Sequence, residues 1–199
     1  MIWKIVVAGV GGQGIISAGV LLAETAVLHE GRHAVQSQTY GAEMRGGLSR
    51  TDVTISDDEV IYPKVDQAHI LACLHAKARE QHRHMVRPGG LIIADENEAP
   101  VPQKMDCRRI ELPIIATVRK ELGSERSANM CLLGVIATVT EVVGWQSLEA
   151  AVTRRYPDAP DALEALRLGQ RISDPFRIDP QQIPRDSTQS GRHATSARM

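Results

Sequence analysis

Glycines close to the start of the chain have the spacing of a phosphate-binding loop. Gly9, Gly11 and Gly14 form the pattern G-x-G-x-x-G, with Gly12 as a further glycine and Gln13 before the last one. Between a strand and a helix, this pattern lets backbone N–H groups approach a pyrophosphate, while the helix N-terminus supplies partial positive charge. Without a ligand, the same glycines only make a tight turn and allow close helix packing.

A second glycine-rich stretch, residues 39–49, reads TYGAEMRGGLS and has no periodicity, so a functional loop is expected there. The guanidinium of Arg45 suits phosphate recognition, but arginine is also enriched at protein interfaces. Two interpretations therefore stay open. Either Arg45 and the backbone of Gly46 and Gly47 close a phosphate site, or this loop docks on a partner.

A dinucleotide site would also need an acidic residue about 20 residues beyond the glycine loop, at the end of the second strand. Residues 35–38 read VQSQ and contain no carboxylate. A free-standing NAD(P)-dependent oxidoreductase is therefore a minor alternative. A different phosphate ligand, or none, fits the sequence better.

Other side chains give no legible catalytic or metal centre. Ser17, Cys73 and Asp95 have no base or orienting acid around them, and Asp95 is better explained as a turn or helix cap. The histidine and cysteine spacings do not match metal sites. The charged run 79–84 is interpreted as a solvated helix face. We predict no catalytic residue and no metal ligand.

The elements around these residues indicate an α/β fold. A continuous apolar run at 2–8 predicts a buried strand, and helical spacing predicts a helix over 14–29. Further strands are expected at 33–38, 51–56, 68–74, 91–94 and 107–112, with a turn at 88–90 and helices at 76–86, 114–122, 128–143, 147–156 and 159–172. This alternation predicts a Rossmann-like, doubly wound, mostly parallel sheet with flanking helices and C-terminal helices. Residues 1–172 form the domain, and 173–199 are expected to be a poorly ordered or partner-draped tail.

The net charge and the amino-acid composition limit the classes of partner that the chain could bind. A net charge of -1 and only 3% aromatic residues argue against nucleic acid and anionic membrane surfaces as partners. Three widely spaced cysteines indicate a reducing compartment, and the first apolar run is too short to span a membrane. We expect a soluble, cytoplasmic protein.

Two long motifs carry a family resemblance. GVGGQGIISAGVLLAETAV, followed by QSQTYGAEMRGGLSRTDVTIS, resembles the gamma subunit of 2-oxoacid:ferredoxin oxidoreductases. The similarity extends through the positions Ile61–Pro63, Asp66, Gly89, Gly90, Asp95, Leu112–Ile114, Asn129 and Gly134. It covers about residues 1–172. The 2-oxoglutarate branch looks most similar, and the pyruvate, ketoisovalerate and indolepyruvate enzymes are relatives.

The resemblance implies oxidative decarboxylation of a 2-oxoacid with coenzyme A, with electrons passing to ferredoxin. Thiamine diphosphate, magnesium and iron–sulfur clusters are then expected on partner alpha, beta or delta subunits, and none is firmly bound by this chain. Coenzyme A is the ligand expected at the glycine loop. The residues expected at this site are Gly9, Gly11, Gly12, Gln13, Gly14, Tyr40, Arg45, Gly46, Gly47 and Asn129.

Asn129 is expected to hold either the ligand or a loop carbonyl. The alternative function is a purely structural adaptor that binds no ligand. In isolation, the chain is expected to be able to self-associate as a homodimer through the face that its partners would cover.

Overall fold

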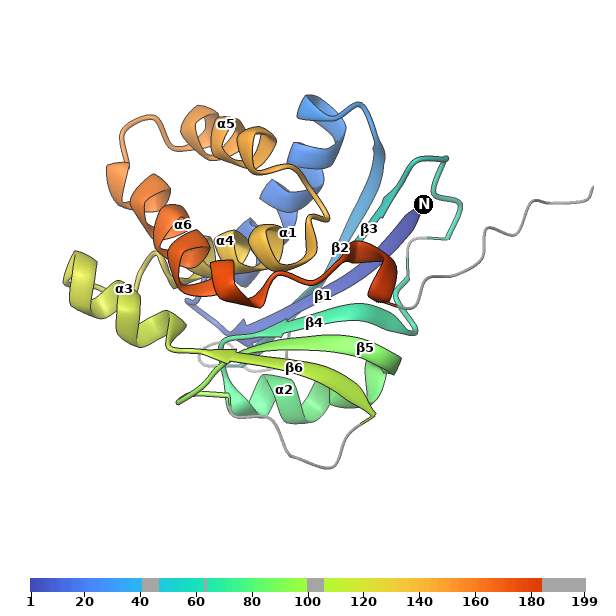
Figure 1. The fold of residues 1–199 in the computed structure, drawn as a ribbon, viewed down its shortest axis with the longest axis horizontal. Coiled ribbons are helices and arrows are strands. Elements are labelled where there is room, and N and C mark those ends of the chain that lie inside the picture. Colours follow the sequence, from blue (N-terminus) through green and yellow to red (C-terminus); the bar gives the residue numbers. More distant parts are fainter. Residues whose placement is uncertain (41–46, 63, 100–105, 184–199) are drawn as a thin grey trace, which may run out of the picture.

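The computed structural model describes residues 1–40, 47–62, 64–99 and 106–183, apart from the side chain of Tyr40. These residues form a twisted sheet of six strands in the order β2-β3-β1-β4-β5-β6 (Figure 1). The strands are β1 (Ile2–Val10), β2 (His33–Tyr40), β3 (Leu48–Ser56), β4 (Ala68–Cys73), β5 (Val86–Asp95) and β6 (Cys107–Leu112).

One strand of the sheet opposes all the others. β3 runs antiparallel to both β1 and β2, whereas β1, β4, β5 and β6 pair in parallel. All six residues of β4 are buried, as expected for a strand covered on both faces. The predicted mostly parallel α/β sheet is confirmed.

Helices cover both faces of the sheet. The longer helices are α1 (Ile15–Glu24), which continues into the π-helical turn η1 (Thr25–His29), α3 (Ile114–Leu122), α4 (Ala128–Thr140), α5 (Trp145–Arg155) and α6 (Pro160–Ser173). Helices α1, α4, α5 and α6 lie over one face, and α2 (Ala76–His82) lies over the other (Figure 1). Every residue of α4 is buried, because α1, α3, α5 and α6 all pack against it. The larger hydrophobic cluster lies on the α4 side and the smaller one beneath α2.

The turn expected at 88–90 lies inside β5 as a strand irregularity. Ala68 pairs with Val86, whereas Ile70 pairs with Leu91, so extra residues bulge out of β5 between these pairs. Gly89 has a φ of 72°, a left-handed conformation that glycine adopts readily. The glycines were thus predicted as a chain reversal, but they kink one continuous strand.

The packed region extends beyond the predicted domain boundary. Residues 174–183 include two short 3-10 turns, η3 (Asp174–Phe176) and η4 (Pro180–Gln182). Ile183 is fully buried, and the Gln182 carboxamide accepts a hydrogen bond from Arg108 at 3.0 Å. The first part of the expected tail therefore packs on the domain, and residues 184–199 lie outside the described residues. None of the described helices is both long and apolar enough to cross a membrane.

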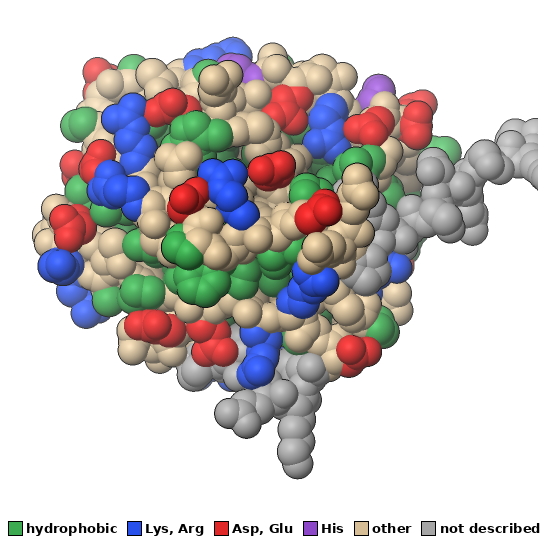
Figure 2. Space-filling view, viewed as in Figure 1, with side chains coloured by type: hydrophobic (Ala, Val, Ile, Leu, Met, Phe, Trp, Pro, Cys, Tyr) green, Lys and Arg blue, Asp and Glu red, His purple; other side chains and the backbone are tan. Residues whose placement is uncertain are grey.

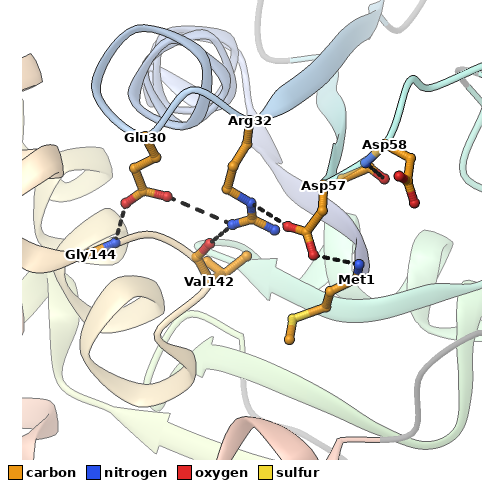
Figure 3. Close-up of polar contacts among 8 residues, drawn as sticks. Met1, Glu30, Arg32, Asp57, Asp58, Val142 and Gly144 are labelled. Carbon is orange, nitrogen blue, oxygen red and sulfur yellow. Dashed lines mark hydrogen bonds and ion pairs between the residues drawn. The ribbon is translucent and has the colours of Figure 1, made fainter.

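Arg32 joins separate segments at the edge of the sheet where β1 begins, beside Met1 and Asp57 (Figure 3). Its Nη1 donates to the carbonyl of Val142 at 2.8 Å, and its Nε donates to Asp57 at 3.2 Å. These bonds connect the residue before β2 with the end of β3 and the α4–α5 connection. Elsewhere on the surface, acidic and basic side chains are interspersed on the face drawn in Figure 2, in keeping with the net charge of -1.

Candidate phosphate-binding site

The glycine loop lies at the edge of the sheet where the parallel strands end. It connects β1 to α1, and the end of β4 lies beside it, with Ala8 paired to Cys73. α1 covers one face of the sheet and α2 the other (Figure 1), so the winding direction changes between β1 and β4. In open α/β sheets, ligands bind at such a switch point, outside the carboxyl ends of the strands.

The backbone of the loop is left-handed at two glycines. Gly12 has a φ of 93° and Gly14 a φ of 67°. Gly11 and Gly12 are exposed, and a Cβ added to Gly12 would meet nothing within 4 Å. α1 has no side-chain cap, and its first backbone bond runs from Ala18 to Gly14 at 3.0 Å. The N–H groups of the first helical turn therefore have no partner within the helix and can face an anion.

The carboxamide of Gln13 braces the loop from inside. Its Oε1 accepts from the Val10 N–H at 2.9 Å, and its Nε2 donates to the Leu74 carbonyl at 3.3 Å. A Cβ on Gly9 would lie 2.4 Å from this Oε1, so only glycine leaves room for the Gln13 side chain. Gln13 thereby connects the ends of β1 and β4.

Asn129 holds the other end of the loop. This residue is only 6% exposed, and its Nδ2 donates to the Gly14 carbonyl at 3.1 Å. A Cβ on Gly14 would lie 2.4 Å from the same nitrogen. Of the two roles expected for Asn129, the structure therefore shows the bond to a loop carbonyl.

The two glycine-rich segments lie side by side. The N–H of Gly11 donates to the Gly47 carbonyl at 2.9 Å, and Val10 pairs with Leu48 where β1 and β3 meet. Because this bond uses the Gly11 N–H, the exposed Gly12 remains as the backbone donor in front of the first turn of α1. Arg45 and Gly46 lie outside the described residues, as does the side chain of Tyr40.

Among the described strands, none is placed to carry the carboxylate that binds the ribose of a dinucleotide. In the Rossmann fold, the strand that carries the ribose carboxylate is parallel to the first strand and adjacent to it. Here the adjacent strand is the antiparallel β3, and β2 lies beyond it. β2 also carries no carboxylate. The topology therefore argues against the NAD(P) alternative more strongly than the sequence did.

Asp95 caps the neighbouring strand end. Its carboxylate is fully buried and accepts from the N–H groups of Asn97 at 3.0 Å, Glu98 at 2.8 Å and Ile115 at 2.8 Å. The interpretation of Asp95 as a turn and helix cap is confirmed.

Burial raises the pKa of the Cys73 thiol and raises that of Cys131 to about 12, so both cysteines are protonated core residues.

The prediction of a solvated face for residues 79–84 was wrong in part. Arg79 and His82 are 8% and 6% exposed, because they lie on the side of α2 that packs on the sheet. Burial is the main cause that lowers the pKa of His82 to about 4. A helix of seven residues is too short for periodicity to separate its buried face from its exposed one. The apolar Ala78, one position before Arg79, was a sequence signal that this helix has a buried side.

Comparisons with known proteins identify the family. The sequence profile of the family "Pyruvate ferredoxin/flavodoxin oxidoreductase" matches residues 4–172. Subunit KorC of 2-oxoglutarate synthase from Methanocaldococcus jannaschii is 35% identical over 156 residues, which cover 77% of this chain and 83% of that subunit. The chain therefore belongs to the pyruvate ferredoxin/flavodoxin oxidoreductase family, as a gamma-type subunit of an oxoacid oxidoreductase complex.

Solved structures agree with this assignment. The gamma subunit of the keto/oxoacid ferredoxin oxidoreductase from Geobacter sulfurreducens superposes with a TM-score of 0.76 at 33% identity, covering 85% of this chain and 96% of that subunit. The 2-oxoglutarate:ferredoxin oxidoreductase of Magnetococcus marinus, solved with 2-oxoglutarate, coenzyme A and succinyl-CoA bound, also has a TM-score of 0.76, at 25% identity. That match covers 89% of this chain but 33% of the longer chain. The predicted resemblance to gamma subunits is confirmed.

Proposed function

We propose that this chain is the gamma subunit of an enzyme that converts 2-oxoglutarate, coenzyme A and oxidised ferredoxin to succinyl-CoA, carbon dioxide and reduced ferredoxin. Four relatives with 34% to 36% identity are subunits of 2-oxoglutarate synthase, which supports this substrate over pyruvate. Thiamine diphosphate, magnesium and iron–sulfur clusters belong to the partner subunits in this proposal. Coenzyme A and ferredoxin are components of the cell interior, and the free cysteines fit a cytoplasmic location.

The glycine loop is proposed to bind the phosphates of coenzyme A. The observation that carries this proposal is the exposed Gly12 turn in front of the uncapped N-terminus of α1, at the switch point of the sheet. Backbone N–H groups and the partial positive charge of a helix start attract phosphate without a ribose carboxylate. The bond between Gly11 and Gly47 brings the end of the second glycine-rich segment to the same edge of the sheet.

In this role the chain performs no bond-making step. Its amides orient the nucleotide end of coenzyme A, so that the thiol end extends to the reaction centre on the partner subunits. Correct positioning of a reactant lowers the entropic part of the barrier. A loss of these contacts therefore weakens coenzyme A binding more than it slows the turnover of the saturated enzyme.

Co-expression with the alpha and beta subunits from the same genome tests the assignment. The purified complex is expected to reduce a viologen dye with 2-oxoglutarate in a reaction that requires coenzyme A. Activity with pyruvate or 2-oxoisovalerate but not with 2-oxoglutarate would contradict the proposed substrate. Failure of the chain to co-purify with these subunits would contradict the assembly.

A charge placed on Gly12 tests the coenzyme A site. Asp and Asn have nearly the same shape and both tolerate left-handed backbone, so Gly12→Asp and Gly12→Asn share any strain and differ in charge. Repulsion of phosphate by Gly12→Asp is expected to raise the KM for coenzyme A at least about tenfold, equivalent to about 1.4 kcal/mol, with kcat nearly unchanged. Equal KM values in the two variants would favour the structural adaptor. That alternative also fits the hydrogen bonds that Gly11, Gln13 and Asn129 make to other groups of the chain.

A further inference from the structure

Arg79 is a buried cation without a matching acceptor. α2 is the helix that packs on β1 and β4 from the side opposite α1 (Figure 1), and Arg79 lies on its inner face. The Nε and Nη1 atoms are both buried and have no hydrogen-bond partner among residues 1–40, 47–62, 64–99 and 106–183. The ion pair from Nη1 to Glu80 spans 3.8 Å, which is too long for a hydrogen bond.

The polar groups near Arg79 do not compensate its charge. Asp52 is engaged through both of its oxygens by the guanidinium of Arg50 on the same strand. Burial, helped by the charge of Arg50, lowers the pKa of His82 to about 4 and keeps this imidazole neutral at physiological pH. The electrostatic influence of Arg79 extends to Cys73, where it opposes the rise of the thiol pKa that burial causes. Among the described residues, no carboxylate therefore accepts a hydrogen bond from Nε or Nη1 of Arg79.

Arg79 lies in the first turn of α2, which begins three residues after β4 ends beside the glycine loop, on the other face of the sheet from α1. Cys73 pairs with Ala8, the residue directly before Gly9, and the N–H of Leu74 donates to the Ala8 carbonyl at 3.2 Å. An arginine beside Cys73 therefore lies at the switch point that the glycine loop approaches from the α1 side. The Arg79 side chain keeps 10% of its surface exposed, so the side chain as a whole still reaches solvent although its Nε and Nη1 are buried.

A buried guanidinium with two unpaired N–H donors is unfavourable unless an acceptor reaches it. Its planar fork matches phosphate oxygens. We propose that Arg79 is an anion-binding residue at the switch point, which takes a phosphate oxygen of a phosphoanhydride ligand. The identity of this ligand as coenzyme A rests on the proposed function, whereas the binding of the anion by the chain itself does not.

Pyrophosphate is the probe for this site in the purified full-length chain. The wild-type melting temperature, followed by circular dichroism, is expected to rise with sodium pyrophosphate relative to sodium chloride of equal ionic strength. Arg79→Met removes the unpaired charge but keeps the volume, so the ligand-free chain is expected to melt at the same or a higher temperature. The pyrophosphate shift is expected to disappear, and the dissociation constant measured by calorimetry to rise at least about tenfold.

Two variants control the experiment. Arg83 lies one turn further along, its side chain is 41% exposed, and its guanidinium pairs with Glu80 at 2.9 Å. The Arg83→Met variant is therefore expected to keep the pyrophosphate shift. Arg79→Lys keeps the charge but loses the fork, and an intermediate shift is expected. A structural arginine would give the opposite pattern: Arg79→Met would melt at a lower temperature without ligand. That result, or an undiminished pyrophosphate shift in Arg79→Met, overturns the proposal.

The assembled enzyme separates this proposal from the proposed function. An increased KM for coenzyme A in the Arg79→Met complex supports coenzyme A as the ligand. If pyrophosphate binding is lost while that KM stays unchanged, the anion site stands and coenzyme A is overturned as its ligand. If Gly12→Asp raises the KM but Arg79→Met affects neither measurement, the glycine loop stands and the role of Arg79 is overturned.

Discussion

The contact between Gly14 and Asn129 allows a quantitative test of how the loop is held. In Gly14→Ala, the new methyl group would lie 2.4 Å from Nδ2 and 2.8 Å from Cγ of Asn129. The φ of 67° adds a left-handed backbone cost of about 1–2 kcal/mol for alanine, and the overlap adds about 1–3 kcal/mol. Asn129 cannot turn away freely, because it is 6% exposed and would lose its bond to the Gly14 carbonyl, worth about 1 kcal/mol.

A double-mutant cycle separates the two costs. In urea unfolding of the purified chain, Gly14→Ala is expected to lower the free energy of unfolding by about 3 kcal/mol, and Asn129→Ala by about 1 kcal/mol. In the double variant the overlap is relieved, so the loss should be smaller than the sum by about 1–3 kcal/mol. Gly12→Ala is the control, because no atom lies within 4 Å of its Cβ, and its effect should add to that of Asn129→Ala. Additivity within about 0.5 kcal/mol for Gly14→Ala would refute the steric argument.

Further predictions concern the helix packing and two charged side chains. A Cβ on Gly169 would lie 2.1 Å from the Cys131 carbonyl, so Gly169→Ala should separate α4 from α6 and cost about 2 kcal/mol net of its gain in helix propensity; a more stable variant in urea unfolding would contradict this. Arg32→Met removes the bond to the Val142 carbonyl and should lower stability by about 1–2 kcal/mol, whereas an unchanged melting temperature would show that solvent replaces the bond. The pKa of His82 is lowered from 6.5 to about 4 in the folded chain, so the neutral imidazole's contribution to the free energy of unfolding is present above pH 6.5 and is lost as the pH falls toward about 4. In His82→Gln, the change in the free energy of unfolding across this pH window should be smaller by roughly 2 kcal/mol. An unchanged slope of stability against pH would contradict this prediction.

Local signals predicted most elements of the fold. The bounds of β6 (Cys107–Leu112) and α3 (Ile114–Leu122) agree with the sequence, because Pro113 separates two short apolar patterns and a glycine follows the helix. The turn expected at 88–90 was placed wrongly, because the bulge in β5 depends on its pairing with β4. The strand order was also beyond local reasoning. Nothing within 48–56 shows that β3 inserts between β1 and β2.

The sequence predicted which residues form the candidate site, but it did not predict what each of them contacts. Sequence reasoning assigned Gly9 and Gly14 to close approach by a ligand, whereas both are in close contact with side chains of the chain itself. Asn129 contacts Gly14 across 115 positions of sequence, so no local pattern could reveal the pair. Arg79 was misjudged because its burial depends on how α2 packs on β1 and β4.

These internal contacts bear on how a ligand would bind. Gln13 and Asn129 hold the loop at both ends through bonds that involve only the chain itself, so its shape does not depend on a bound phosphate. A preformed loop loses little conformational entropy on binding, which favours affinity from few contacts. The same argument divides the glycines by role: Gly9 and Gly14 give space to the bracing side chains, and Gly12 faces open space. Substitution at Gly12 should therefore affect binding before stability, and substitution at Gly14 should affect stability first.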